Sequence, residues 1–189
     1  MGMRQIVATL KSVSPMAQSK YHRAEKLDKE LYDAYEERTW REKLNVTPDG
    51  FAFIPPMAFK NCISEAAKFL SIQIPGKGKA TYTKHFEAGV MVIDGLKLPT
   101  KKEDVKGLWL HVPADGKRGG SKRVMKCFPE IPEWGGDVTF YVLDDTITKD
   151  VFEQHLREAG KFIGVGSFRP RNNGFYGRFD VVRTKEIKG

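Results

Sequence analysis

Hydrophobic and polar residues follow two different periods along the chain, and together these predict six core elements. Four segments carry the alternating or β-like pattern of strands: 4–13, 89–98, 137–143 and 175–182. The segment 57–70 has apolar residues at helical spacing, and a second helix is predicted over 149–159, with Thr148 as its N-cap and Gly160 at its end. The resulting order of strand, helix, strand, strand, helix, strand predicts an α+β fold with a ferredoxin-like (βαββαβ) core.

Two insertions interrupt this core, over about 14–55 and 99–136. The first contains a charged segment, 27–40, whose loose apolar stripe predicts a peripheral helix. In the second, two β-like arms flank a glycine-rich basic tip, which predicts a long basic β-hairpin. The arms are 108–112 and 124–128. Because no internal repeat is visible and the length suits one folding unit, residues 1–189 are expected to form a single domain.

The composition adds a preference for polyanionic partners. The chain carries 32 Lys and Arg residues against 24 Asp and Glu, a formal net charge of +8, and 40% of its residues are hydrophobic. The hydrophobic fraction is sufficient for a packed core. The positive charge favours nucleic acid first and an anionic membrane surface second.

Cysteine and histidine give little support for a metal site or an enzyme. Cys62 and Cys127 are far apart in sequence, which indicates neither a four-cysteine zinc site nor a disulfide framework. The four histidines lack metal-ligand spacing, so no metal or cofactor is expected. His155 lies among charged neighbours and is expected at the surface. No signal peptide or membrane span is recognisable, which predicts a cytoplasmic protein with no membrane partner.

A glycine-rich segment between the second helix and the last strand is the strongest candidate binding site. Its glycines are Gly164, Gly166, Gly174 and Gly177. Glycine permits close backbone approach, and amide N–H groups in such a loop can hold phosphate oxygens. Its arginines, Arg169, Arg171 and Arg178, provide planar donors suited to phosphate. Phe175 and Tyr176 could stack on nucleobases. The alternative is a surface turn in which the glycines only make tight bends.

Three other polar segments add candidate contacts with a sugar-phosphate chain. The predicted hairpin tip contributes Lys117, Arg118, Lys122 and Arg123. The segment after the first helix contributes Lys77 and Lys79. The segment after the first strand contributes Gln18, Ser19, Lys20, His22 and Arg23. Cationic side chains release counterions from a phosphate backbone. Each segment could equally be a solvated loop, because charge runs usually are.

Three motifs of the chain resemble motifs of the RAMP superfamily, the RNA-recognition-motif-like (RRM-like) proteins of CRISPR effector complexes. They are the glycine-rich loop Gly164-Val165-Gly166…Gly174-Phe175-Tyr176-Gly177-Arg178, the opening Ala8-Thr9-Leu10-Lys11-Ser12-Val13-Ser14-Pro15-Met16, and Ile54-Pro55-Pro56-Met57-Ala58-Phe59-Lys60-Asn61-Cys62. The chain is also similar to small phage- and prophage-encoded proteins. The resemblance implies that the hairpin 116–126 is a thumb, and that residues 14–23 and Lys60 line a backbone groove.

These features lead to one main hypothesis and two alternatives. The main hypothesis is non-catalytic binding of single-stranded nucleic acid, with RNA favoured over single-stranded DNA, by a homo-oligomer that self-associates along the strand. The first alternative is a metal-independent endoribonuclease of the CRISPR-repeat-processing type, using His22, Tyr21 and Lys20. The second is a phage interaction protein that mimics a CRISPR backbone subunit and binds CRISPR-type or phage proteins.

Overall fold

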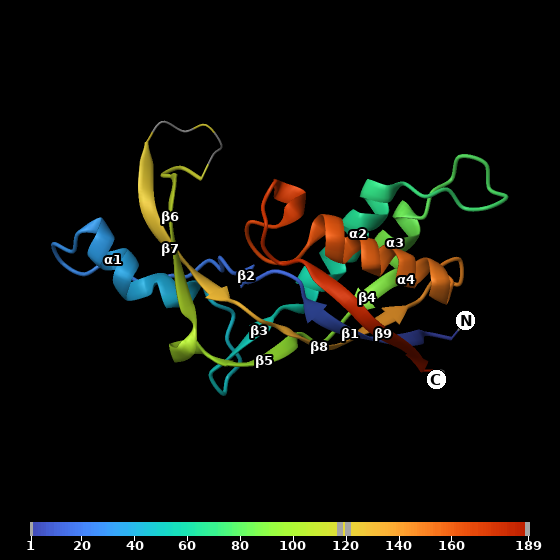
Figure 1. Ribbon diagram of the computed structural model, residues 1–189, viewed down its shortest axis with the longest axis horizontal. Helices are drawn as coiled ribbons and strands as arrows, with labels where there is room; N and C mark the ends of the chain where they lie inside the picture. Colours follow the sequence, from blue (N-terminus) through green and yellow to red (C-terminus); the bar gives the residue numbers. More distant parts are fainter. Residues whose placement is uncertain (1, 117–118, 120–121, 188–189) are drawn as a thin grey trace.

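The computed structural model describes residues 2–116, 119 and 122–187 as a mixed α/β protein (Figure 1). Its strands are β1 (Arg4–Ser12), β2 (Met16–Ala17), β3 (Phe51–Ile54), β4 (Val90–Val92), β5 (Leu96–Lys101), β6 (Lys106–Pro113), β7 (Arg123–Ile131), β8 (Gly135–Val142) and β9 (Phe179–Ile187). Its α-helices are α1 (Tyr32–Thr39), α2 (Pro56–Leu70), α3 (Thr83–Gly89) and α4 (Lys149–Glu158). Short helical turns are η1 (Trp40–Lys43), η2 (Lys102–Asp104), η3 (Ala159–Ile163) and η4 (Pro170–Asn172).

The largest sheet is antiparallel, with the order β4-β8-β1-β9, and α2 and α4 lie on the same side of it (Figure 1). The alternation in β1 places Ile6 and Leu10 in the core, where both are at most 2% exposed. Phe140 from β8 meets Phe152 from α4 with ring centroids 5.2 Å apart. The predicted core therefore forms from residues whose periodicity is visible in the sequence.

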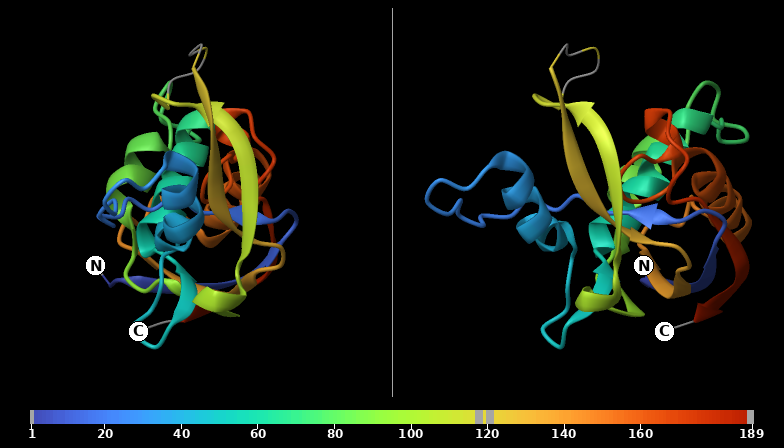
Figure 2. Two further views of the ribbon diagram at one scale, coloured as in Figure 1. Left: turned by 90° about the vertical axis from the view of Figure 1, so that its left-hand side faces the viewer. Right: turned by 60° about the vertical axis from the view of Figure 1, so that its left-hand side comes forward.

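The insertions build a second region beside this sheet. β1 leads into β2, which pairs with β7, and β7 in turn leads into β8. The β6–β7 hairpin rises away from the main sheet, and α1 lies on the far side of the hairpin from that sheet (Figures 1 and 2). The smaller β3–β5 sheet lies at the base. The predicted hairpin is thus present, with arms longer than expected.

Two predicted elements differ from the observed ones in extent. The helix predicted over 27–40 begins only at Tyr32, because the chain turns at residues 28–29, where Lys29 has a positive φ of 54°; Leu27 and Leu31 are 59% and 77% exposed. The strand predicted over 89–98 is divided: β4 joins the main sheet, whereas β5 pairs with β3.

The last strand and His155 also correct the sequence predictions. The strand expected from residue 175 begins at Phe179, because residues up to 178 belong to the loop and Gly177 has a positive φ of 77°. His155 is buried, not exposed: it is 0% exposed and stacks on Phe86 at 4.3 Å. No helix in the described part of the chain is long and apolar enough to span a bilayer.

Candidate nucleic-acid interface

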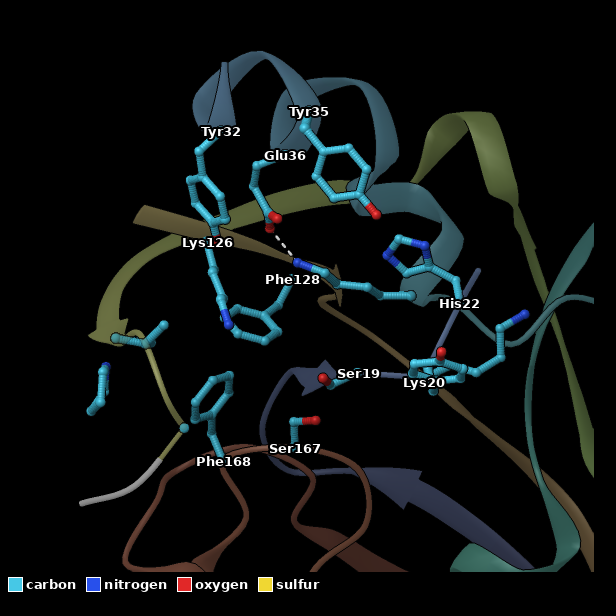
Figure 3. A pocket seen from close by; sticks show the side chains of 15 residues that line it. Ser19, Lys20, His22, Tyr32, Tyr35, Glu36, Lys126, Phe128, Ser167 and Phe168 are labelled. Carbon is cyan, nitrogen blue, oxygen red and sulfur yellow. Dashed lines mark hydrogen bonds and ion pairs between the residues drawn. The ribbon is translucent and has the colours of Figure 1, made fainter. Parts of the chain in front are cut away.

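Four segments of the chain surround one open pocket of about 720 Å³ (Figure 3). The segment after β2 contributes Ser19, Lys20, Tyr21 and His22; the α1–η1 region contributes Tyr32, Tyr35, Glu36 and Lys43; the hairpin contributes Val112, Pro113, Gly116, Lys126 and Phe128; and the glycine-rich loop contributes Ser167 and Phe168. We call this pocket the groove.

Backbone hydrogen bonds join the glycine-rich loop to the segment after β1. The Ser167 amide donates to the Ala17 carbonyl at 2.8 Å, and the Gly177 amide donates to the Pro15 carbonyl at 2.7 Å. The Ser14 hydroxyl also donates to the carbonyl of Phe175 at 2.9 Å. The structure therefore brings together two of the segments that the sequence predicted separately.

The groove carries an excess of positive charge. Lys20 is exposed and Lys126 partly exposed, and neither is part of an ion pair formed among the described residues. Glu36 is the lone carboxylate among the described lining residues, and Lys43 neutralises it. A bound polyanion would thus meet two lysines and no unpaired carboxylate on these walls.

His22 is held in a defined orientation at the groove. Its Nδ1 accepts a hydrogen bond from the Ala24 amide at 3.3 Å, and its ring is roughly parallel to that of Tyr35, with centroids 6.4 Å apart. Because Nδ1 accepts, the neutral imidazole carries its proton on Nε2. The ring can therefore donate a hydrogen bond from Nε2 to a phosphate oxygen.

Aromatic rings form much of the remaining wall. Phe128 and Phe168 meet edge to face with centroids 4.9 Å apart, and this contact joins the hairpin to the glycine-rich loop. Tyr32 is 40% exposed, and partial burial of its phenol raises the pKa of this group. The groove thus combines cations with flat apolar surfaces, as surfaces that bind single strands do.

Three of the four loop glycines use their backbone amides inside the protein. The amides of Gly164, Gly174 and Gly177 all donate to carbonyls within the protein, at 2.7–3.0 Å. A Cβ on Gly174 or Gly177 would lie 1.8 Å from a backbone oxygen, and one on Gly166 would lie 2.5 Å from another. The amides of Gly164, Gly174 and Gly177 are therefore already bonded inside the protein, which favours the tight-bend alternative at these three positions.

The arginines and aromatic residues predicted in this loop lie outside the groove lining. Arg169 donates to both carboxylate oxygens of Glu65 at 3.0 Å, and Nε of Arg178 donates to the carbonyl of Lys161 at 3.2 Å. Arg171 is exposed on η4, and Phe175 is 57% exposed. Tyr176 packs edge-on against Phe168, and burial raises the pKa of its phenol.

Gln18 and Lys60 are engaged inside the protein. Gln18 is 4% exposed; its Oε1 accepts from the amide and side chain of Asn45, and its Nε2 donates to the carbonyl of Phe53. The Lys60 ammonium donates to the carbonyls of Phe86 and Glu87 at 2.8 and 2.9 Å, and burial lowers the pKa of this group. Both side chains stabilise the fold at the positions where the sequence predicted contacts with nucleic acid.

The remaining predicted cations are distributed over the molecule. Lys117 and Arg118 lie outside the described residues. Lys122 and Arg123 are exposed at the start of β7, and Arg123 donates to the carbonyl of His111. Arg23 is exposed next to the groove. The segment that carries Lys77 and Lys79 projects at the end of the molecule opposite α1 (Figure 1), so it is not part of the groove.

Several residues of the groove were missed by the sequence predictions, and one local signal could have revealed two of them. Tyr32 and Tyr35 are three residues apart and so share one face of α1. Phe128 and Phe168 have no such signal, because contacts between distant segments bring them together.

No group of three or more His, Cys, Asp or Glu side chains that could hold a metal occurs among the described residues.

Comparisons with known proteins support the fold. No family model and no curated protein matches the chain. A chain of the Type III-B Cmr-beta complex, solved by cryo-electron microscopy with cognate target RNA, is similar over 98% of this protein, with a TM-score of 0.52 and 11% identity. This protein spans 61% of that chain.

Two other solved structures are similar at lower scores. They are Cmr6 from Pyrococcus furiosus (TM-score 0.47, 14% identity, 96% of this chain and 99% of that one) and a chain of a CRISPR RNA-guided surveillance complex (TM-score 0.36, 10% identity, 92% and 65%). Because the Cmr-beta chain is only 11% identical to this protein, its similarity is evidence about the fold alone. The protein thus has a mixed α/β fold similar to that of this chain of the Cmr-beta complex.

Proposed function

We propose that this protein binds single-stranded nucleic acid, RNA in preference to DNA, in the groove and without catalysing a reaction. The observation that carries the proposal is the composition of the groove: Lys20, His22 and Lys126 share its walls with aromatic rings, and its carboxylate is internally paired. Lysines can neutralise successive phosphates, and aromatic rings can stack on bases of any sequence.

The fold supports the choice of ligand. The antiparallel sheet with α2 and α4 on one side is consistent with a ferredoxin-like, RRM-like core. The similar Cmr-beta chain belongs to a complex bound to target RNA, which favours RNA over DNA as the ligand of this protein. On the same basis we propose that copies of the chain associate side by side along a strand, or with CRISPR-type proteins.

The direct test is fluorescence anisotropy with labelled single-stranded RNA, single-stranded DNA and duplex RNA over a series of salt concentrations. The groove variant is Lys20→Glu/Lys126→Glu. The matched control is Lys77→Glu/Lys79→Glu, which makes the same change in net charge outside the groove. We expect tight binding of single strands at low salt, with an affinity that falls steeply as salt rises.

The two double variants separate local from general electrostatics. We expect the groove variant to lose at least about tenfold in affinity and to have a shallower salt dependence, because each lost phosphate contact lowers the slope by about 0.7 for a single strand. The control should lose much less. Equal losses in both variants would show that net charge, not the groove, attracts the strand; absent binding at low salt would refute the proposal.

A second candidate function is cleavage of RNA in the same groove. Its basis is that His22 lines the groove beside Lys20 and Tyr21, with a fixed ring orientation. Incubation of the protein with structured RNA in the presence of a chelator separates the two functions. Discrete products that disappear with His22→Ala would establish an endoribonuclease, whereas intact RNA supports binding alone.

The interaction hypothesis requires a different measurement. Copies associated along a strand separate when the strand is digested, whereas a protein that mimics a CRISPR subunit keeps its protein partner. Purification from the native cell with and without nuclease treatment, followed by size-exclusion chromatography with light scattering, distinguishes these outcomes. We expect an assembly that falls to smaller species after nuclease treatment.

A further inference from the structure

Phe168 has a backbone conformation that bulky residues rarely adopt. Its φ is +54°, in the left-handed region, where a side chain with a Cβ crowds the backbone. Such residues persist only where the surrounding structure holds them, and they concentrate at functional sites. The left-handed conformation of Phe168, together with its position at the groove, therefore points to a functional role for this residue.

Neighbouring groups hold this conformation from three sides. The Phe168 carbonyl accepts a hydrogen bond from the Tyr176 amide at 3.0 Å. Gly174 leaves room for that carbonyl, because a Cβ there would lie 1.8 Å from its oxygen. The Phe168 ring meets Phe128 edge to face at 4.9 Å. Gly174, whose amide donates to the Arg169 carbonyl, thus leaves the space that this conformation of Phe168 needs.

The ring that is presented this way lies in the groove. Figure 3 shows Phe168 rising from the loop toward Phe128 and Lys126, with Tyr32 on the opposite wall. Phe168 keeps part of its surface accessible, whereas Phe128 is 7% exposed. The groove volume of about 720 Å³ falls within the range of pockets that enclose small ligands, about 300–1,000 Å³.

We propose that Phe168 is a base-stacking residue, against which one nucleobase of the bound strand packs between this ring and the Tyr32 wall. Lys126, which lines the same groove, then binds the adjoining phosphate. The inference rests on the proposed function of the groove. It assigns the stacking role to Phe168 in place of Phe175 and Tyr176, which do not line the groove.

The test compares a short single-stranded oligouridylate with an abasic ribose-phosphate chain of the same length, so that the two ligands differ only in their bases. The variant is Phe168→Asn, since asparagine tolerates left-handed φ and so keeps the loop. The matched control is Phe175→Asn, which removes an exposed ring from the same loop but not from the groove. Thermal unfolding monitors the fold of both variants.

We expect wild type and Phe175→Asn to bind the oligouridylate about 5- to 150-fold more tightly than the abasic chain, the range for one stacked base. Phe168→Asn should lose this preference while keeping its affinity for the abasic chain. Equal binding of both ligands by wild type, or a preference retained in Phe168→Asn, overturns the inference while the proposed function stands. If wild type binds neither ligand, the proposed function itself fails.

Discussion

Glu36 and Lys43 form a buried ion pair that also binds both backbone groups of Cys127. The Lys43 ammonium donates to the Cys127 carbonyl at 2.9 Å, and the Cys127 amide donates to Oε1 of Glu36 at 2.7 Å. Glu36 is 3% and Lys43 9% exposed. The pair therefore fixes the α1–η1 region to the middle of β7, and so sets the distance between two walls of the groove.

Glu36→Ala should strongly destabilise the protein, because it leaves the buried Lys43 ammonium without a counter-ion and the Cys127 amide without an acceptor. We expect the free energy of unfolding in urea to fall by about 3–5 kcal/mol. The double variant Glu36→Leu/Lys43→Met should be less destabilised than Glu36→Ala, since it removes both charges together.

Asp49 provides the matched control for this ion-pair prediction. It pairs with Lys97 at the surface, where both side chains are more than half exposed. Asp49→Ala should change the unfolding free energy little, because exposed ion pairs contribute little. If Glu36→Ala also has little effect, the pair does not stabilise this region as the contacts indicate.

The core was predictable because its signal is local. β1, α2 and α4 each show their period within one segment, and burial of the resulting apolar face determines how they pack. The strand pattern over 89–98 was misassigned, because composition alone does not indicate which partner strand each half joins.

The groove was only partly predictable, because contacts between distant residues create it. Lys20 and His22 could be nominated from their types, but Phe128 and Phe168 meet only once the hairpin and the glycine-rich loop have packed together. Residue type also could not show that Gln18 is buried and bonded to Asn45. Residue type suggested the candidate contacts, and tertiary packing determines which of these side chains a ligand can reach.

His155 should make the stability of the protein depend on pH. It stacks on Phe86, and burial lowers its pKa from the usual 6.5, while the hydrogen bond with the Val151 carbonyl opposes this shift. The unfolded chain therefore binds a proton below about pH 6.5 that the folded protein does not bind. The resulting stability is fully present above pH 6.5 and falls as the pH decreases toward the folded pKa.

Urea denaturation at a series of pH values from about 7.5 to about 5 measures how the free energy of unfolding changes with pH. His155→Leu replaces the imidazole with a side chain that does not titrate, so it should lose less stability than wild type over the same range. His111→Leu, at an exposed position of the hairpin, is the control and should follow wild type. A wild-type dependence retained in His155→Leu would assign the effect to another group.

Gly177→Ala should destabilise the protein far more than Gly50→Ala, although both glycines have positive φ, of 77° and 87°. At Gly50 a Cβ meets nothing within 4 Å, so only the conformational cost of about 1–2 kcal/mol applies. At Gly177 a Cβ would lie 1.8 Å from the Val165 carbonyl oxygen. Thermal unfolding of the two variants measures this difference, and equal losses would contradict a packing role for Gly177.

Arg169 and Glu65 allow a test of whether this arginine binds phosphate or stabilises the loop. If Arg169 binds phosphate, Glu65→Gln frees its guanidinium and should raise the affinity for a single strand. The bidentate contact between the Arg169 guanidinium and the Glu65 carboxylate, at 3.0 Å, favours the structural role. We therefore expect Glu65→Gln and Arg169→Gln each to lower the free energy of unfolding by about 1 kcal/mol. The double variant should lose less than the sum, which a double-mutant cycle detects. Because the loop carries Phe168, both single variants should also weaken binding of a base-containing strand. Tighter binding by Glu65→Gln would instead show that Arg169 contacts a phosphate of the bound strand.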